Sequence, residues 1–402
     1  MSTPVVSTPA SLSMARSPLF VTGKNNALAN DLLYSMNCNI KIWWGALGDE
    51  PASYNYQLSK AYSINEVINF EISDLIRSEF SHSFASYDST SIAQSLNGEV
   101  LYVELVGDWS YSDNGSAPSS GVWATSTKFF VTDGWRKYTQ NSEHTTTPMA
   151  VSRKRFVSET GYETLPIYWN STINTKYFGI QWANGDFEDV DIEVSTGISP
   201  SSGSTTAKLL YFPSGVANLN AYTGFSASMR PLNRSGQTNY TLYFKNPSGT
   251  KIWEQEYEIT CEPKYTPYQI AFVNRYGASD YITMFKRSEE QGAFTSERYN
   301  RSIYVDGFTT PNLQEAKYQD FNINSRNSIT MNTGWVEEAY ADVVEDIFMS
   351  ERVAILLDGE WVAASPKRGS VTYQKEVNDK NINYTLGFDI AFDQRNMLRW
   401  TR

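Results

Sequence analysis

The 402-residue sequence predicts a mainly β protein, built from tandem β-sandwich-like domains with one amphipathic helix in a C-terminal α+β region. Aromatic residues make up 14% of the chain, including 26 Tyr and 11 Trp, while charged residues make up only 19%. Tyr and Trp favour pleated, half-buried surfaces. Short alternating apolar and polar runs recur between turn signals, which indicates strands, and one segment near the C-terminus has helical periodicity instead.

The first 17 residues predict an extended N-terminal arm. Pro4 and Pro9 interrupt regular structure, and Ser and Thr are abundant in this segment. Few apolar side chains are available to repay the entropy of ordering. We therefore expect this arm to be mobile in an isolated subunit and ordered in an assembly.

Residues 18–135 predict a first β domain. A turn at residues 48–51 separates two alternating runs, which indicates a hairpin. Residues 67–80 (VINFEISDLIRSEF) change from strand to helical spacing, so we expect a strand followed by a short helix. The predicted strands of this domain are 38–47, 54–58, 99–108 and 122–132, with an exposed Ser/Gly/Pro-rich loop at 110–121.

A Thr-rich segment leads to a second β-sandwich domain at residues 150–263. Its clearest feature is a hairpin in which residues 240–245 and 252–259 flank an Asn-Pro-Ser-Gly turn. Regularly spaced short strands favour a sandwich. The strands are predicted at 165–169, 177–182, 190–194, 207–212, 240–245 and 252–261.

Residues 264–402 predict a β-rich C-terminal domain that contains a helix at 336–349. The apolar residues of this helix recur at the i, i+3, i+4, i+7 spacing of one buried face. They are Val336, Ala339, Tyr340, Val343, Val344, Ile347 and Phe348, and they leave Asp342, Glu345 and Asp346 facing water. Asp358-Gly359 predicts one hairpin, and residues 378–381 predict a second.

The overall charge and the apolar pattern limit the partners. A formal net charge of −11 disfavours nucleic-acid binding, which depends on clustered Lys and Arg. Neither a signal peptide nor an apolar run long enough for a membrane span is evident. Cys38 and Cys261 are far apart in sequence, so we expect two buried free thiols in a protein made in a reducing compartment.

The sequence offers little catalytic chemistry. His82 and His144 each lie in a Ser/Thr-rich neighbourhood, so we expect both in surface loops. Neither has the partners of a zinc site or a catalytic triad, and no phosphate-binding glycine loop follows a predicted strand. We therefore expect a protein that is not an enzyme and holds no metal or cofactor.

The acidic stretch 186–193 (DFEDVDIE) is the best candidate for an exception. Glycoside hydrolysis needs two carboxylates, and carboxylates also bind calcium. The acids alternate with Val190, Ile192 and Val194, however, so a strand would place the acids on its solvent face and the aliphatic residues on its core face. A solvated face is the favoured interpretation, and calcium binding and catalysis remain alternatives.

Three aromatic residues near the Ser/Gly-rich loop are candidate contacts for a partner or a glycan. They are Trp109, Tyr111 and Trp123. Exposed rings of this kind stack on sugars, whereas packing in a core or an interface is the ordinary role of aromatic residues in β domains.

Several passages resemble structural proteins of tailed bacteriophages. They are VINFEISDLIRSEF at 67–80, VWATSTKFFV at 122–131, IAFVNRYGASDYITMF at 270–285, TGWVEEAYADVVEDIFMSERV at 333–353 and VNDKNINYTLGFDIAF at 377–392. The resemblance implies a non-enzymatic virion component, of the tail or baseplate type, that assembles into a symmetric ring or connector.

Its expected partners are other virion proteins and copies of itself. Its expected location is the virion, after synthesis in the host cytoplasm. A receptor- or glycan-binding adhesin, such as a component of a tail fibre or head fibre, is the alternative. A polysaccharide-degrading enzyme is a more distant one.

Overall fold

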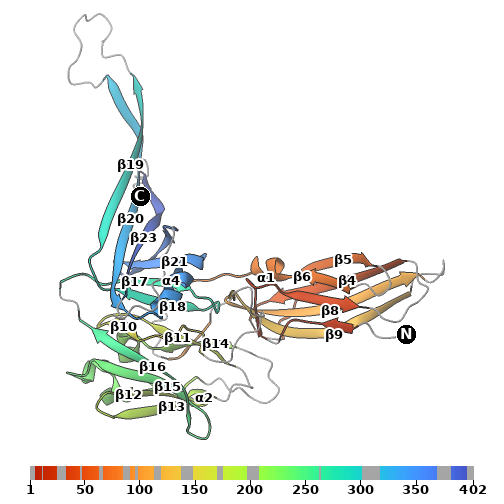
Figure 1. Cartoon of the computed structure of the whole chain (residues 1–402), viewed down its shortest axis with the longest axis horizontal. Coiled ribbons are helices and arrows are strands. Elements are labelled where there is room, and N and C mark those ends of the chain that lie inside the picture. Colours follow the sequence, from red (N-terminus) through yellow and green to blue (C-terminus); the bar gives the residue numbers. More distant parts are fainter. Residues whose placement is uncertain are drawn as a thin grey trace, which may run out of the picture. The chain divides into compact units, whose positions relative to one another are not determined.

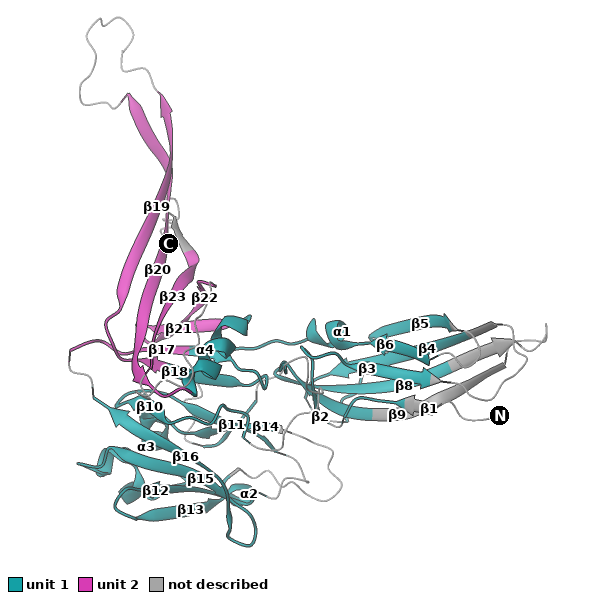
Figure 2. Ribbon diagram, in the orientation of Figure 1, with its two compact units in different colours: residues 1–261, 271–282, 339–351 teal, residues 262–270, 283–338, 352–402 magenta. Residues whose placement is uncertain are grey.

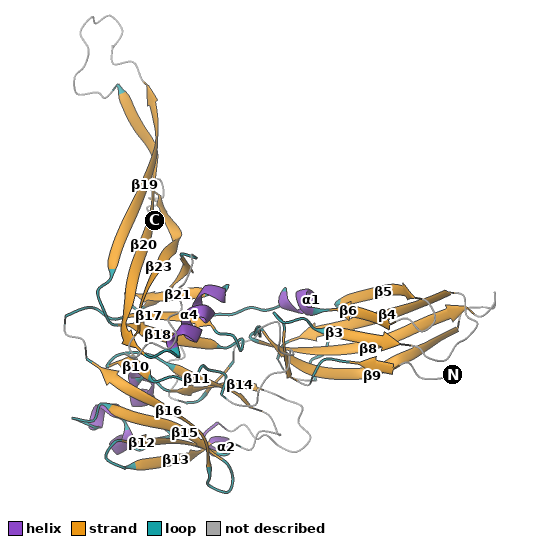
Figure 3. Cartoon of the chain, in the orientation of Figure 1, coloured by secondary structure: helices purple, strands orange, loops and turns teal. Residues whose placement is uncertain are grey.

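A computed structural model of the chain confirms the prediction of a mainly β protein with several separate sheets: strands make up 55% and helices 11% (Figure 3). Two compact units are present (Figure 2), the first formed by residues 1–261, 271–282 and 339–351 and the second by the remainder. The structure describes residues 5–10, 12–24, 33–45, 48–62, 67–84, 91–95, 98–112, 119–136, 148–169, 175–196, 208–261, 264–300, 317–368 and 382–395.

The N-terminal part of unit 1 is a two-sheet domain around one core (Figure 1). Its elements are β1 (Val5–Ser7), β2 (Leu12–Met14), β3 (Phe20–Lys24), β4 (Leu33–Trp43), β5 (Tyr56–Tyr62), β6 (Val67–Glu71), α1 (Ser73–Arg77), β8 (Val100–Ser112) and β9 (Ser119–Thr132). One sheet has the order β2-β9-β8-β4-β5 and the other β1-β3-β6. Val21 of β3 and Val103 of β8 belong to the same buried cluster, so residues of both sheets share the core.

The predicted change from strand to helix is confirmed in β6 and α1. Ile68 and Phe70 are buried, whereas the residues that alternate with them are exposed. Ile76 of α1 is buried as well, after the spacing changes to that of a helix. The predicted hairpin of β4 and β5 is also present, with Ile40 opposite Tyr56.

The described residues near the N-terminus do not form a separate arm. β2 pairs in parallel with β9, and Met14 is fully buried. Arg16 donates two hydrogen bonds of 2.7 Å to the carboxylate of Asp133. Burial acts to raise the pKa of Asp133, but Arg16 and then His82 hold it below its ordinary value. Local sequence patterns did not predict these contacts, because the partners lie far away along the chain.

We expect the N-terminal segment to resist hydrogen exchange in a monomer. The Ala15 amide donates to the Thr132 carbonyl and the Arg16 amide to the Gly134 carbonyl, both at 2.9 Å. Both amides should therefore exchange only when the first domain opens. Exchange mass spectrometry on verified monomer measures this, and free exchange of residues 15–16 would contradict the pairing.

The second part of unit 1 contains two further sheets. They have the orders β10-β16-β15-β12-β13 and β11-β14-β7, and their facing residues share a second core. The elements are β7 (Ala93–Gln94), β10 (Arg155–Ser158), β11 (Thr164–Trp169), β12 (Tyr177–Trp182), β13 (Phe187–Asp191), α2 (Ile192–Thr196), β14 (Lys208–Pro213), α3 (Val216–Ala221), η1 (Ala227–Met229), η2 (Pro231–Asn233), β15 (Asn239–Lys245) and β16 (Lys251–Thr260).

The hairpin predicted in this domain is confirmed. β15 and β16 are antiparallel, and Gly249 in the turn has a φ of 82°, which glycine adopts without strain. Short β7 was not predicted. It comes from the N-terminal part of the sequence and pairs with β14 at Leu210, so the second domain borrows a strand from before its expected start.

The predicted C-terminal domain is divided between the two units. Unit 1 includes half of β17 (Tyr268–Val273), most of β18 (Ser279–Met284) and all of α4 (Tyr340–Met349). The predicted apolar helical face is confirmed, because Tyr340, Val343, Val344 and Ile347 are buried. The helix begins four residues later than predicted, since β20 (Tyr318–Val336) continues as strand through Val336.

One acid of this helix does not face water. Asp346 is 1% exposed, and its Oδ1 lies 2.8 Å from Nε of Arg275. Asp342 and Glu345 also approach the Arg275 guanidinium, at 3.1 and 3.3 Å. Helical periodicity identified the apolar face correctly, but it did not predict that Arg275 would pair with the acidic residues of the helix.

Unit 2 contains strands in the order β21-β22-β23-β20-β19. They are β19 (Glu289–Asn300), β20, β21 (Val353–Leu357), β22 (Glu360–Pro366) and β23 (Ile382–Arg395). The predicted hairpin at Asp358-Gly359 is confirmed, and both turn residues have positive φ, 51° and 85°. The first strand of the other predicted hairpin, residues 371–377, lies outside the described residues. Its second strand corresponds to β23.

Candidate interaction surface

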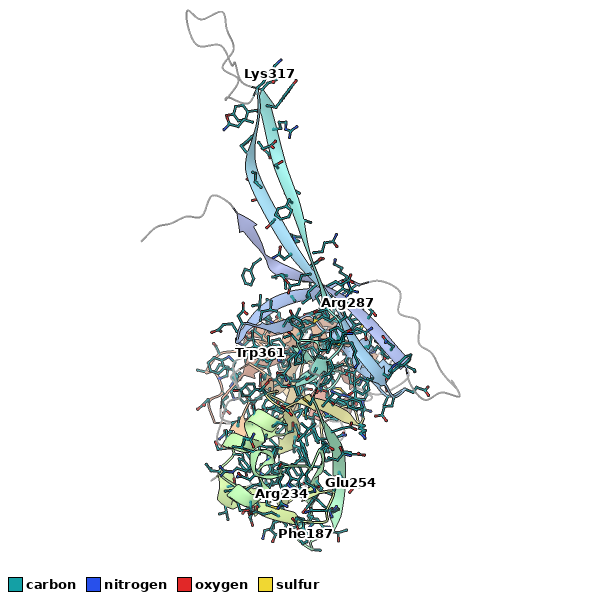
Figure 4. The ribbon with its side chains drawn as sticks, turned by 90° about the vertical axis from the view of Figure 1, so that its left-hand side faces the viewer. Phe187, Arg234, Glu254, Arg287, Lys317 and Trp361 are labelled. Atoms are coloured by element: carbon teal, nitrogen blue, oxygen red, sulfur yellow. The ribbon has the colours of Figure 1, made fainter. Side chains whose placement is uncertain are left out.

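The most unusual surface of the described chain is a long two-stranded ribbon in unit 2. We define the ribbon as β19 together with residues 318–330 of β20, which pair antiparallel from Glu289↔Thr330 to Asn300↔Tyr318. Figure 4 shows Arg287 near the base of the ribbon and Lys317 at its far end. β23 pairs with β20 only from Asn324 onward. Among the described strands, residues 318–323 therefore pair with β19 alone.

Both faces of the far half of the ribbon are open to solvent. All residues of β19 are exposed, as are residues 318–323 of β20. Several of these side chains are large and apolar: Phe294 is 76% exposed, Tyr318 57%, Tyr299 43%, Phe321 43% and Ile323 38%. Isolated two-stranded hairpins are marginally stable in water, and gathered apolar residues on a surface mark an interaction site. The ribbon is therefore the candidate functional site.

The two faces of the far end differ in chemistry. Residues opposite each other in an antiparallel pair point to the same face. Arg298 lies opposite Asp320, and Nε of Arg298 is 2.7 Å from Oδ1 of Asp320, so one face has an ion pair. This contact lowers the pKa of Asp320 and raises that of Arg298.

The opposite face is aromatic. Glu297 lies opposite Phe321, and Tyr299 lies opposite Gln319. The rings of Tyr299 and Phe321 are 5.5 Å apart in an edge-on arrangement, and the Tyr299 hydroxyl donates to Oε1 of Gln319 at 2.7 Å. These contacts order the aromatic side chains and leave their outer surfaces exposed.

A bulge separates the far end from the rest of the ribbon. The register shifts between Thr295 and Glu297, and Asn322 on the other strand has a φ of 49°. Asn tolerates this left-handed conformation better than most residues. A bulge increases the local twist of a ribbon. The ion-pair face and the aromatic face are thus turned relative to the base.

These residues were not predicted from the sequence. Phe294, Tyr299 and Phe321 were not assigned to strands or to a site. A signal was available in residues 318–324, where Phe321 and Ile323 alternate with Asn. Alternation predicts a strand with one buried face, yet here the apolar residues are exposed, which no local pattern reveals.

The three aromatic residues predicted as contacts lie on paired strands rather than in a loop. Trp109 and Tyr111 are in β8 and pair with Gly121 and Ser119 of β9, the strand that also contains Trp123. Their side chains lie outside the described part of the structure. The partner or glycan role of these residues stays a prediction.

The acidic stretch forms β13, which ends at Asp191, three residues before the predicted end of the strand at Val194. In β13, Asp189 is exposed and Val190 packs against the second core, as predicted. The strand ends at Asp191, whose Oδ1 accepts the amides of Glu193 and Val194 at the start of α2. An Asp before a helix satisfies free amides in this way. Val194 is consequently 83% exposed, contrary to the prediction.

Partners in the fold account for the acids of this stretch. Asp189 accepts from the Tyr243 hydroxyl and pairs with Lys245, both at 2.6 Å, and Asp186 pairs with Arg234. A pocket of about 300 Å³ lies beside Asp191. Across the described residues, no group of three or more His, Cys, Asp or Glu is arranged to hold a metal ion.

The strongest charge cluster is buried inside unit 1. Arg153, Arg155, Glu163 and Asp280 have side chains at most 2% exposed. Asp280 lies 3.3 Å from Arg153 and 3.0 Å from Arg155, and Glu163 lies 3.4 Å from Arg155. Burial acts to raise the pKa of Asp280, but the two guanidinium groups lower it to about 2. The cluster joins β10 to the β18 strand and is structural.

Glu163 makes the stability of unit 1 depend on pH near neutrality. Burial raises its pKa from 4.5 to about 7, although Arg155 and Arg153 act to lower it. The unfolded chain then loses this proton at lower pH than the folded chain, so stability falls as pH rises from about 4.5 to 7. Asp346, whose pKa burial also raises to about 7, acts in the same direction.

Replacement of Glu163 with Gln should therefore weaken this pH dependence. Urea unfolding at pH 5 and pH 8 measures the loss of stability between the two values. We expect a smaller loss in Glu163→Gln than in the parent, with the remainder due to Asp346. Equal losses in both proteins would show that Glu163 is ionised in the folded state throughout this range.

Two further predictions need correction. His82 is not on the surface: its side chain is 2% exposed, and Nε2 lies 3.2 Å from Oδ2 of Asp133. His144 lies outside the described residues. Both cysteines are free, but only Cys38 is buried, and Cys261 is exposed. Burial raises the pKa of the Cys38 thiol to about 12, with a contribution from Asp108.

Comparisons with known proteins do not identify a relative. No family model and no curated protein matches the sequence. Among solved structures, a marsupial T cell receptor is similar at 10% identity, over 82% of this chain and 96% of that one, with a TM-score of 0.16. Similarity at this level supports no argument about function. Within the described residues, no helix is both long and apolar enough to cross a membrane.

Proposed function

We propose that this chain is a non-enzymatic structural subunit of a virion, of the tail or baseplate type. The observation that supports this most is the ribbon, which presents large exposed apolar side chains and whose far end, among the described strands, consists of β19 and β20 alone. A surface of this kind is favourable in a subunit that buries it against a neighbour. The resemblance to tail proteins supports the particular assembly, a symmetric ring or connector.

The experiment is an inventory of purified particles. Mass spectrometry should find the chain as a stoichiometric component, and image reconstruction should place its ribbon against another chain. Absence of the chain from intact particles would reject the proposal.

A receptor- or glycan-binding adhesin is the second candidate. Tyr299 and Tyr318 expose ring surface on the ribbon, and aromatic rings of this kind stack on sugars as well as on proteins. A glycan array separates the two functions. Binding that is lost in Tyr299→Ser and Tyr318→Ser would favour the adhesin.

A further inference from the structure

We propose that the partner of the ribbon is the same surface on further copies of this chain, and that each ribbon contacts two copies. This inference rests on the proposed function as an assembly subunit and names the partner of its contact surface. Two features of the ribbon support it: self-complementary faces and a limited area.

Each face of the far end contains both halves of a contact. The ion-pair face presents Arg298 and Asp320, 62% and 39% exposed, so the cation of one copy is able to pair with the anion of another. The aromatic face presents Tyr299 and Phe321, and aromatic pairs are favourable with each other. A surface that matches itself is what a two-fold contact between identical chains requires.

The size of the ribbon indicates more than two copies. The 12 residues of β19 span about 40 Å at about 3.3 Å per residue, and a two-stranded ribbon is about 10 Å wide. One face therefore offers about 400 Å², whereas stable interfaces bury about 800 Å² per partner. Two contacts, one on each face, together bury about 800 Å² per chain. An assembly of more than two chains follows.

Charge reversal provides the sharpest test. Arg298→Asp and Asp320→Arg should each weaken self-association of the full-length chain by about tenfold or more, because like charges then meet across copies. An equimolar mixture of the two variants should restore assembly, since the acidic face of one matches the basic face of the other. Sedimentation velocity at about 10 μM, a concentration that populates complexes with micromolar Kd, measures the masses.

A second pair of variants tests the apolar contribution. Phe294→Ser combined with Phe321→Ser should shift the assembly toward monomer, whereas Leu232→Ser, at a side chain 78% exposed in unit 1, should not. Circular dichroism of each variant confirms that the domains remain folded.

A parent chain of three or more copies, loss in the single reversals and recovery in the mixture would establish the homotypic contact. A monomeric or dimeric parent, unaltered assembly in both reversals, or a mixture that stays dissociated would overturn it. Those outcomes differ from failure of the proposed function, which is absence of the chain from purified particles.

Discussion

Replacement of Asp280 with Asn is expected to lower the free energy of unfolding by about 3–5 kcal/mol. Its carboxylate lies between Arg153 and Arg155, and both guanidinium groups are buried. Asn retains the shape but not the charge, so two buried cations would share only Glu163. Removing one partner of a buried ion pair costs about this much because the remaining charge has no solvent to stabilise it.

Urea unfolding of the full-length chain, followed by tryptophan fluorescence, measures this change. Asp189→Asn is the matched control, because Asp189 pairs with Lys245 where water still reaches both side chains. Exposed ion pairs contribute at most about 1 kcal/mol, so this variant should unfold close to the parent. Equal destabilisation by the two variants would mean that the buried cluster contributes no more than a surface pair.

Val344→Asp is expected to destabilise unit 1 far more than Glu345→Ala, although the positions are adjacent. Val344 is fully buried on the apolar face of α4, and an unpaired carboxylate there costs on the order of 2–5 kcal/mol. Glu345 is 27% exposed and makes the longest of the three acidic contacts with Arg275. Its loss should cost less than about 1 kcal/mol.

Thermal melts of the two variants beside the parent, at equal concentration, give the comparison. A third variant, Asp346→Ala, separates the apolar face from the acidic one. Because Asp346 is buried against Arg275, we expect it to be more harmful than Glu345→Ala. If Val344→Asp and Glu345→Ala melt alike, α4 does not pack through its apolar face.

Features with short-range causes were predicted well. Alternation identified β6, and the change to helical spacing identified α1. Asp358-Gly359 predicted a two-residue turn whose positive φ values the structure confirms. The apolar face of α4 followed from periodicity alone. In each case, the residues that determine the conformation lie within a few positions of one another.

Charged residues with distant partners were predicted poorly. His82 was expected on the surface but lies buried against Asp133. Arg155 and Asp280 are 125 positions apart, and Arg16 and Asp133 are 117 apart. Composition indicates only that such residues prefer water. Whether a particular one is buried depends on an opposite charge that the fold brings to it.

The ribbon has both kinds of feature: its strand pattern has short-range causes, whereas its exposure depends on distant parts of the chain. From the sequence alone came the mainly β architecture, the tandem sandwiches and the hairpin turns, because side-chain period and turn chemistry act locally. Only the tertiary structure decided that β20 pairs with β23 from Asn324 onward, and that residues 318–323, before that point, pair with β19 alone. Alternation accompanies a buried Phe70 in β6 but an exposed Phe321 on the ribbon. The difference arises because a side chain is buried only where another layer covers that face of the strand. The sequence of the strand itself does not specify whether such a layer is present.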